Sequence, residues 1–344
     1  MQQFKTAVLS YFRSFMRGEA EVSESWKLHA NRTSLIIIIS SGIVALVLYV
    51  FVVQPPATFP TDELVSVPEG LTLSQVSDTL YEDGVIRSPL AFRILIKILG
   101  HERGVQAGDY QFKEPLDIFT IARSISIGAF GLEAQHILIP EGATTKQMSI
   151  IFSAKLQRFD QANFLAQAQP LEGYLFPDTY FFLPNATEDM VIQAMRQNFD
   201  DHEKQIDPMV QSSGRSLHDI VIMASIIERE ARNTQDRRMI SGVLWNRIDK
   251  KMALQVDVTF LYTIGKGTFQ LTMKDLLSDS PYNTYVNKGL PPTAIGSPSL
   301  DSLIAAADPI KNDYYFYLAD KKGVTHFSKT YKEHARKQLL YLGT

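Results

Sequence analysis

Two glutamates close a nearly apolar stretch of the sequence, and their type and spacing suit acid catalysis. The stretch is VIMASIIEREA (Val221–Ala231), which has the composition of a buried helix until it reaches Glu228 and Glu230. Carboxyl groups at the end of such a run are either a solvated helix terminus or acids held in a site. A carboxyl group shielded from water has a raised pKa and can donate a proton near neutral pH.

A helical projection separates the two carboxyl groups. At about 100° per residue, Glu228 falls on a polar side of the helix, and Glu230 falls on the opposite side among apolar residues. The polar side is completed by Ser225 and Arg229, and the apolar neighbours of Glu230 are Met223, Ile226 and Ile227. We therefore expect Glu230 to be the candidate general acid and Glu228 to stay ionised on the wetter side. The alternative is a frayed helix end at which Glu230 points into water.

The sequence gives only weak indications of chemistry other than acid catalysis. His326, in GVTHFSKT, could titrate near neutral pH, although a single histidine after a turn more often has a structural role. The chain has no cysteine, its seven histidines lack metal-binding spacing, and no phosphate loop or nucleophile elbow is present. We therefore expect neither a metal nor a cofactor. The net charge of −3 argues against a nucleic acid partner.

A run without charge, LIIIISSGIVALVLYVFVV (residues 35–53), predicts one membrane-spanning helix. Basic residues precede it and none follows until Arg87. The positive-inside rule therefore puts residues 1–34 in the cytoplasm and the rest of the chain outside the inner membrane, in the periplasm. A cleaved signal peptide is the alternative, but the run is long for one and no small-x-small cleavage pattern follows promptly.

The remaining chain divides into three predicted parts. Residues 54–63 are a Pro-rich stalk, residues 64–132 a small βααβ subdomain, and residues 133–344 a larger α+β catalytic domain. The subdomain looks like a sugar-binding module of the LysM type by its order of elements and its size, without a motif. The predicted fold class is thus α+β with a single N-terminal transmembrane helix.

Two similar segments open the subdomain and the larger domain. VSVPEGLTLSQVSDTL and ILIPEGATTKQMSIIF each predict a strand, a Pro-Glu-Gly turn and a helix that begins with a T-x-x-Q capping box. The boxes are Thr72 with Gln75 and Thr144 with Gln147. An internal duplication and two independent strand-turn-helix units explain this likeness equally well.

Taken in order, several segments resemble the YceG-like family, the membrane-anchored endolytic murein transglycosylases. Two of them, EGYLFPDTYFFLP and DSPYNTYVNKGLPP, mix aromatic and polar residues as sugar-binding grooves and packed loops both do. The resemblance runs roughly from Pro140 to Ala335, and the anchor and the LysM-like unit match the family's layout. The matching segments are EGYLFPDTY, ASIIERE, VLWNRI, LQVDVT, SPYNTYVNKGLPPTAIGSPS, THFSKT and EHA. Val258 and Ala294 stand where the family has prolines, which puts the local loop shape in doubt.

The resemblance implies cleavage of the β-1,4 bond between N-acetylmuramic acid and N-acetylglucosamine in nascent peptidoglycan. The product carries a 1,6-anhydromuramoyl end, and such cuts near the membrane would terminate strand elongation. Glu230 matches the second glutamate of the family's ASI-(I/V)-E-(K/R)-E motif, the catalytic acid, and Glu228 is a supporting residue. The expected substrate-binding residues are Gln255, Asp257, Asn283, Tyr285, Tyr174, Glu172 and His326.

A single acid suits this reaction. The C6 hydroxyl of the sugar attacks from within the substrate, so no second carboxylate is needed to activate water. Two alternatives stay open: a hydrolytic muramidase with Glu230 as acid and Asp257 as base, and a non-catalytic wall-binding scaffold for synthases. The expected partners are peptidoglycan strands and the inner membrane, with peptidoglycan synthases as further candidates.

Overall fold

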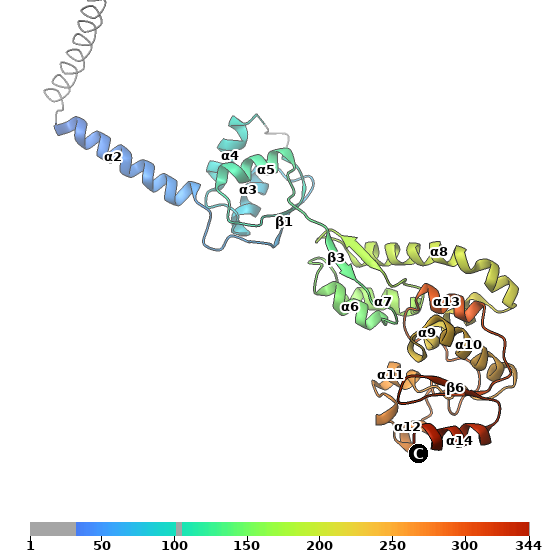
Figure 1. Ribbon diagram of the computed structural model, residues 1–344. Helices are drawn as coiled ribbons and strands as arrows, with labels where there is room; N and C mark the ends of the chain where they lie inside the picture. Colours follow the sequence, from blue (N-terminus) through green and yellow to red (C-terminus); the bar gives the residue numbers. More distant parts are fainter. Residues whose placement is uncertain (1–31, 101–104, 344) are drawn as a thin grey trace, which may run out of the picture. The chain divides into compact units, whose positions relative to one another are not determined.

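The computed structural model describes residues 32–100 and 105–343. They divide into two compact units, residues 1–131 and 132–344 (Figure 1). Helices dominate both units, and each sheet has only two strands, so the fold class is α+β. The predicted cytoplasmic tail lies almost wholly outside the described residues.

The first unit begins with the apolar helix. Helix α2 (Arg32–Leu48) continues into a π-helical turn, η1 (Tyr49–Val53). Residues Ser34–Val53 are long and apolar enough to cross a membrane. Their side chains are exposed up to Phe51, as expected for a helix whose solvent is lipid.

The rest of the first unit is a small helical domain on one hairpin-like pair of strands. Strands β1 and β2 are antiparallel, with Val65 opposite Tyr110, and both of these side chains are buried in the core. The segment predicted as a stalk belongs to this fold, because Phe59 is 8% exposed in the same core. The elements are β1 (Leu64–Val67), α3 (Leu73–Glu82), α4 (Pro89–Ile98), β2 (Gly108–Gln111) and α5 (Ile118–Ile127).

The second unit starts with a two-stranded sheet and three helices. Strand β3 pairs antiparallel with β4, with Ile137 opposite Tyr180, and a cluster of phenylalanines packs beneath them. The capping boxes predicted at Thr72 and Thr144 are both present at the starts of α3 and α6. The elements are β3 (Gln135–Leu138), α6 (Thr145–Ser153), α7 (Gln161–Ala168), η2 (Gln169–Leu171), β4 (Thr179–Phe182) and α8 (Glu188–Ser213).

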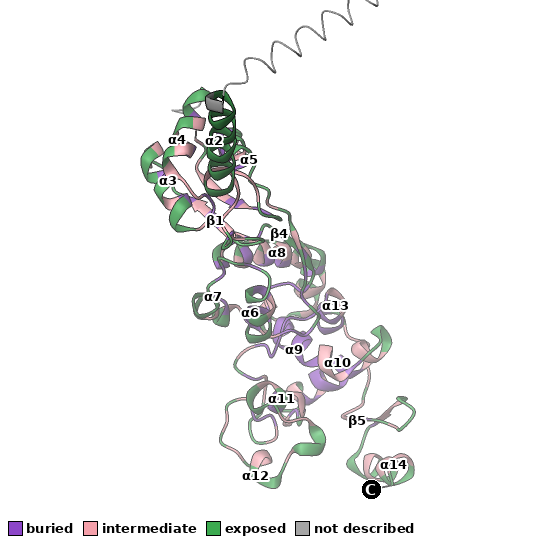
Figure 2. Ribbon diagram, turned by 90° about the vertical axis from the view of Figure 1, so that its left-hand side faces the viewer, coloured by how far each residue is buried: buried purple, intermediate pink, exposed green. Residues whose placement is uncertain are grey.

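Helix α9 (Leu217–Glu230) lies at the centre of the second unit. Every residue from Ile220 to Ile227 is buried, and α9 packs against α13 and α10 (Figure 2). Strands β5 and β6 form the third antiparallel pair, with Tyr317 opposite Phe327. The elements are α10 (Thr234–Asp249), α11 (Val258–Ile264), η3 (Thr268–Gln270), α12 (Met273–Leu276), α13 (Leu300–Ala307), β5 (Phe316–Ala319), β6 (Thr325–Ser328) and α14 (Tyr331–Tyr341).

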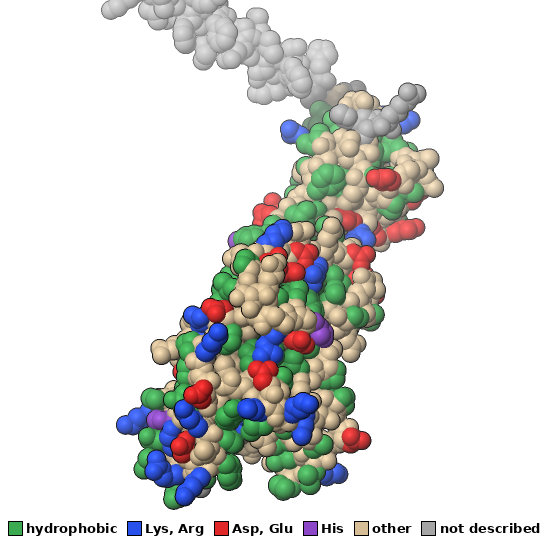
Figure 3. Space-filling model, turned by 90° about the vertical axis from the view of Figure 1, so that its right-hand side faces the viewer, with side chains coloured by type: hydrophobic (Ala, Val, Ile, Leu, Met, Phe, Trp, Pro, Cys, Tyr) green, Lys and Arg blue, Asp and Glu red, His purple; other side chains and the backbone are tan. Residues whose placement is uncertain are grey.

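Charged side chains of both signs are interspersed on the face drawn in Figure 3. This distribution fits the small net charge of −3.

The close packing of α10 yields a stability prediction at Gly242. A Cβ atom there would lie 2.4 Å from the Ile310 carbonyl oxygen and 2.5 Å from Asn312 Nδ2. We expect Gly242→Ala to lower the free energy of unfolding by about 1–3 kcal/mol, because the backbone at Ile310 must shift to make room for the methyl group. This cost exceeds the gain from the higher helix propensity of alanine. Urea denaturation followed by Trp245 fluorescence, in a Trp26→Phe background, measures the change.

The control is Gly267→Ala, where a Cβ would meet nothing within 4 Å. We expect that variant to unfold like the parent. A Gly242→Ala protein as stable as Gly267→Ala would show that the contact between α10 and the Ile310 segment is looser than described.

Candidate active site

Helix α9 delivers its last turn to the candidate site. The helix begins at the Ser216 cap and ends when Ala231 turns extended, with φ −135° and ψ 145°. The Ser225 hydroxyl donates to the Ile222 carbonyl oxygen at 2.7 Å and accepts a bond from the Ile295 backbone amide at 3.0 Å. Residues Ile220 to Ile227 of α9 are buried, so the helix that carries the final residues is held in the core.

Glu230, the last residue of α9, has a shielded carboxyl group that is bonded to a tyrosine. Its Oε2 accepts a hydrogen bond of 2.9 Å from the hydroxyl of Tyr317 on β5. Burial of the carboxyl group raises the pKa of Glu230 to about 7, the bond from Tyr317 lowers it, and the negative charge of Asp257 raises it. The carboxyl group is therefore able both to give and to take a proton near neutral pH.

Tyr317 acts on Glu230 only as a donor. Burial, followed by the nearby charge of Glu230, raises the pKa of Tyr317 well above its usual value. The phenol therefore keeps its proton, and its bond occupies one oxygen of Glu230. The second oxygen remains for a ligand, and Glu230 as a residue is only partly buried.

Asp257 and Tyr285 form the second part of the site. Asp257 is the residue before α11, and its Oδ1 accepts a 2.5 Å hydrogen bond from the Tyr285 hydroxyl. Burial raises the pKa of Tyr285, and the hydrogen bond and charge of Asp257 raise it further. The protonated Tyr285 phenol thus fixes one oxygen of Asp257, the residue whose charge raises the pKa of Glu230.

Hydrogen bonds join the two chain segments that carry Asp257 and Tyr285. The Gln255 amide donates to the Thr284 carbonyl oxygen at 3.0 Å, and the Val256 amide donates to Thr284 Oγ1 at 3.0 Å. Gln255 has φ 53°, in the left-handed region, where a residue other than glycine is uncommon. The backbone contacts therefore bring LQVDVT and SPYNTY, distant in sequence, to one place.

Arg247 organises the site, and the sequence analysis gave it no role. Its Nε donates to the Tyr315 carbonyl oxygen at 2.7 Å, and its NH2 donates to Gln255 Oε1 at 3.2 Å. Its NH1 donates to the Leu254 carbonyl oxygen. One buried guanidinium thereby ties the segment before β5 to the segment before Asp257. Nothing in the spacing of VLWNRI singles this arginine out, because its partners lie in distant segments or on backbone carbonyl groups.

The expectation that Glu228 lies on a wetter side is wrong. Its side chain is 5% exposed, and Oε2 accepts bonds from the Ser299 amide at 2.8 Å and hydroxyl at 2.5 Å. Its Oε1 pairs with Arg237 at 2.8 Å, and Arg237 also pairs with Asp301 at 2.7 Å. The polar side of α9 is covered by α10 and the start of α13, so tertiary packing encloses a side that the helix alone would leave in water.

Asn283 and Glu172, which the sequence analysis expects to contact substrate, are buried and bonded within the protein. Asn283 is 1% exposed, and its amide donates to the carbonyl oxygens of Leu276 at 3.0 Å and Ser278 at 2.8 Å. Glu172 is 4% exposed and accepts a 2.9 Å bond from Thr145 Oγ1. Burial raises the pKa of Glu172.

Tyr174 and His326 have partners outside the Glu230 cluster, which consists of Glu230, Tyr317, Asp257 and Tyr285. The Tyr174 hydroxyl lies 3.1 Å from His218 Nδ1. His326 Nε2 lies 3.0 Å from Asp320 Oδ2, and its ring stacks on Tyr341 at 3.8 Å between centroids. These contacts fit the structural role that was left open for His326.

Two adjoining hollows lie beside the end of α9. The larger one, of about 570 Å³, is lined by Thr144 and by the end of α11, including Tyr262. The smaller one, of about 180 Å³, is lined by Glu141 and Glu228. Gln147 and Arg229 line both. Helix α11 starts next to Asp257 and ends in the larger hollow, so the two hollows and the Glu230 cluster are neighbours along one short helix.

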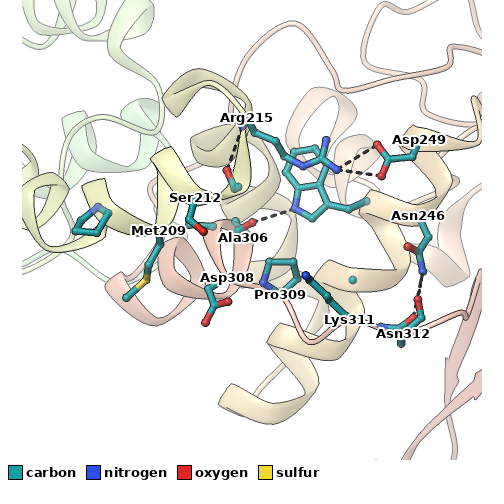
Figure 4. A pocket seen from close by; sticks show the side chains of 15 residues that line it. Met209, Ser212, Arg215, Asn246, Asp249, Ala306, Asp308, Pro309, Lys311 and Asn312 are labelled. Carbon is teal, nitrogen blue, oxygen red and sulfur yellow. Dashed lines mark hydrogen bonds and ion pairs between the residues drawn. The ribbon is translucent and has the colours of Figure 1, made fainter.

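A third hollow, of about 660 Å³, lies elsewhere on α8, α10 and α13 (Figure 4). None of the predicted site residues lines it. Arg215 stacks on Trp245 at 3.7 Å and pairs with Asp249 at 3.1 Å, so its charged group is already satisfied within the protein. Within the described residues, no group of three or more His, Asp or Glu side chains is placed to hold a metal ion.

Comparisons with known proteins agree with this arrangement of motifs. A family model described as the YceG-like family matches residues 65–339. A Bacillus subtilis (strain 168) protein named endolytic murein transglycosylase is 34% identical over 307 residues, which cover 81% of this chain and 85% of the relative. A Streptococcus pneumoniae (serotype 2, strain D39) protein of the same name is 26% identical over 79% of this chain and 57% of its own length.

A solved structure is also similar. The crystal structure of a yceG-like protein from Listeria monocytogenes has 32% sequence identity and a TM-score of 0.54. The match covers 80% of this chain and 98% of that chain.

The raised pKa of Glu230 predicts a pH-dependent stability difference. A carboxyl group whose pKa rises on folding contributes most stability below its unfolded pKa of 4.5 and loses it as pH rises through about 7. Glu230→Gln stays neutral at every pH. We therefore expect the variant to gain about 3 kcal/mol over the parent above neutrality and nothing near pH 4. Urea denaturation across this pH range measures the gap.

Glu69→Gln, at an exposed position, is the control and should show no such trend. A gap between Glu230→Gln and the parent that stays constant from acid to alkaline pH would contradict the described burial of the Glu230 carboxyl group.

Proposed function

The chain belongs to the YceG-like family, and we propose that Glu230 is the general acid of its reaction. The protein is an endolytic murein transglycosylase, the activity for which its Bacillus and Streptococcus relatives are named. The observation that supports Glu230 most directly is its enclosed carboxyl group, bonded to Tyr317 and with a pKa of about 7.

The reaction needs one group that first gives and then takes a proton. The Glu230 carboxylic acid protonates the glycosidic oxygen as the bond from C1 of the muramic acid breaks, and positive charge develops at C1. The C6 hydroxyl of the same sugar attacks C1 and closes the anhydro ring. Its proton passes to the Glu230 carboxylate, which restores the acid. No water is consumed, and a pKa near neutrality favours both steps.

Asp257 and Tyr285 would act on the charged intermediate. The Asp257 carboxylate is a negative charge that raises the pKa of Glu230, and such a charge stabilises an oxocarbenium-like state. Tyr285 holds one of its oxygens in place. Gln255 would contact substrate polar groups, while Glu228 supports the site by fixing the last turn of α9 to Ser299 and Arg237.

The glycan strand would lie along α11 toward the hollow lined by Thr144, Tyr262 and Arg229. Helix α11 is seven residues long, about 10 Å at 1.5 Å per residue. Polar side chains and a phenol line the hollow, a mixture suited to hydroxyl and amide groups of a sugar. A groove that continues beyond the acid suits cleavage inside a strand.

The remaining assignments complete the proposal. Residues 35–53 would anchor the chain in the inner membrane, with residues 1–34 in the cytoplasm and the catalytic domain, residues 133–344, in the periplasm. The subdomain of residues 64–132 would be a LysM-like module that binds glycan strands. Cutting nascent strands near the membrane would terminate their elongation, and peptidoglycan synthases are the natural partners.

Product mass identifies the reaction. Purified glycan strands incubated with the enzyme should give fragments with anhydro ends, one water lighter than the products of a muramidase. We expect Glu230→Gln to lower the rate at least about a hundredfold because the general acid is gone. Asp249→Asn, which removes a carboxylate outside the site, should cleave like the parent.

Hydrated reducing ends would instead support the muramidase alternative with Asp257 as base. A folded parent enzyme that leaves strands intact would support the wall-binding scaffold.

The pH dependence of kcat/KM tests the two neighbours of Glu230 in opposite directions. For the parent, we expect activity to fall as pH rises through about 7, because the acid must be protonated. Tyr317→Phe removes the bond that lowers the pKa of Glu230, so the alkaline limb should move to higher pH. Asp257→Asn removes the charge that raises this pKa, so the limb should move to lower pH. Limbs that coincide in all three proteins would refute the assignment of Glu230 as the titrating acid.

A further inference from the structure

Helix α4 of the first unit carries an exposed apolar stripe. Leu90, Ile94 and Ile98 are 61%, 48% and 75% exposed. Their spacing of four residues places them on one side of the helix. The opposite side is anchored in the domain core through Phe92 and Ile96, which are fully buried. The exposed side is therefore a fixed apolar surface on a folded helix. It differs from the isolated exposed apolar residues that are common on protein surfaces.

The start of α4 is tied to the end of the membrane-spanning segment. Arg87, the residue before the α4 cap Ser88, donates from Nε to the Gln54 carbonyl oxygen at 3.1 Å and from NH2 to the Pro55 carbonyl oxygen at 2.9 Å. Val53, the last residue of the span, packs against the core of this domain. Turn η1 contacts α5, which in turn packs on α4. No free linker therefore separates the span from the helix that bears the stripe (Figure 1).

Two basic residues border the stripe. At about 100° per residue, Lys97 falls beside Leu90 on the exposed side of α4, and Arg93 falls at the border of that side. Arg93 is half-buried and donates from NH1 to Ser74 Oγ at 2.7 Å. An apolar side bordered by Arg and Lys is the pattern of helices that lie in the headgroup region of a membrane, where the cations meet anionic lipids. The charges of Arg93 and Lys97 would attract anionic headgroups while the apolar residues enter the acyl boundary.

We propose that the stripe Leu90, Ile94 and Ile98 lies on the outer surface of the bilayer that residues Ser34–Val53 cross. The proposal rests on the membrane anchoring described under the proposed function. Lipid is the favoured occupant because the bonds from Arg87 to Gln54 and Pro55 keep α4 beside the end of the span in every molecule. Docking on the membrane would fix the tilt of the domain relative to the bilayer.

Spin labelling of the full chain tests the proposal, and the absence of native cysteines makes each label unique. Ile94→Cys would be labelled and reconstituted in vesicles of phosphatidylcholine and phosphatidylglycerol. We expect the ratio of oxygen to aqueous nickel-chelate accessibility to be several-fold higher there than at Asp78→Cys, an exposed polar position on α3. Val44→Cys, inside the span, reports whether the anchor is in lipid.

The outcomes separate this proposal from the anchoring. A lipid-like signal at Val44 with an aqueous signal at Ile94, equal to that at Asp78, would overturn the surface contact and leave the anchor intact. That result would point to a protein partner for the stripe. An aqueous signal at Val44 would overturn both. In vesicles without phosphatidylglycerol we expect a shallower Ile94 label, and an unchanged depth would refute the part assigned to Arg93 and Lys97.

Discussion

The enclosure of one carboxyl group, that of Glu230, is the constraint on which the catalytic unit depends. An ionised carboxylate is costly to remove from water, so burial raises its pKa toward the range of neutral-pH proton transfer. That state persists only if the surrounding elements keep water and cations away while one partner fixes the orientation. The buried stretch of α9, Ile220 to Ile227, contributes to the first condition, and Tyr317 provides the second.

Much of the unit serves to bring three distant segments to this carboxyl group. Arg247 links the segment before β5, and so Tyr317, to the segment that carries Gln255 and Asp257. Thr284 joins that segment to Tyr285. On the other side of α9, Glu228 is paired with Arg237 and bonded to Ser299, which holds the last turn of the helix. The two glutamates therefore have different tasks: one is kept available for chemistry, and the other has its hydrogen-bonding capacity used by the fold.

In the first unit, the apolar helix is joined to the small domain without a free linker. The segment after the span is packed onto the small domain through Phe59 and Arg87, so the membrane helix and the domain form one continuous structure. An enzyme that acts on nascent strands needs to stay near the membrane where those strands emerge. A domain fixed to the bilayer surface by its own helix restricts the positions that the anchor allows, which a flexible stalk would not do.

The sequence by itself determined the local features of this protein. The apolar span, the two capping boxes at Thr72 and Thr144, and the apolar run that makes α9 a core helix all follow from short-range periodicity and spacing, and each has a direct physical cause in helix geometry. Only the tertiary structure decided which polar side chains face the site and which are consumed by the fold. Glu228 and Asn283 are polar residues in matching motifs, yet both are buried against partners far away in the chain. Arg247 and Tyr317 carried no signal of their own, because a hydrogen bond between distant segments leaves no periodic pattern in either one.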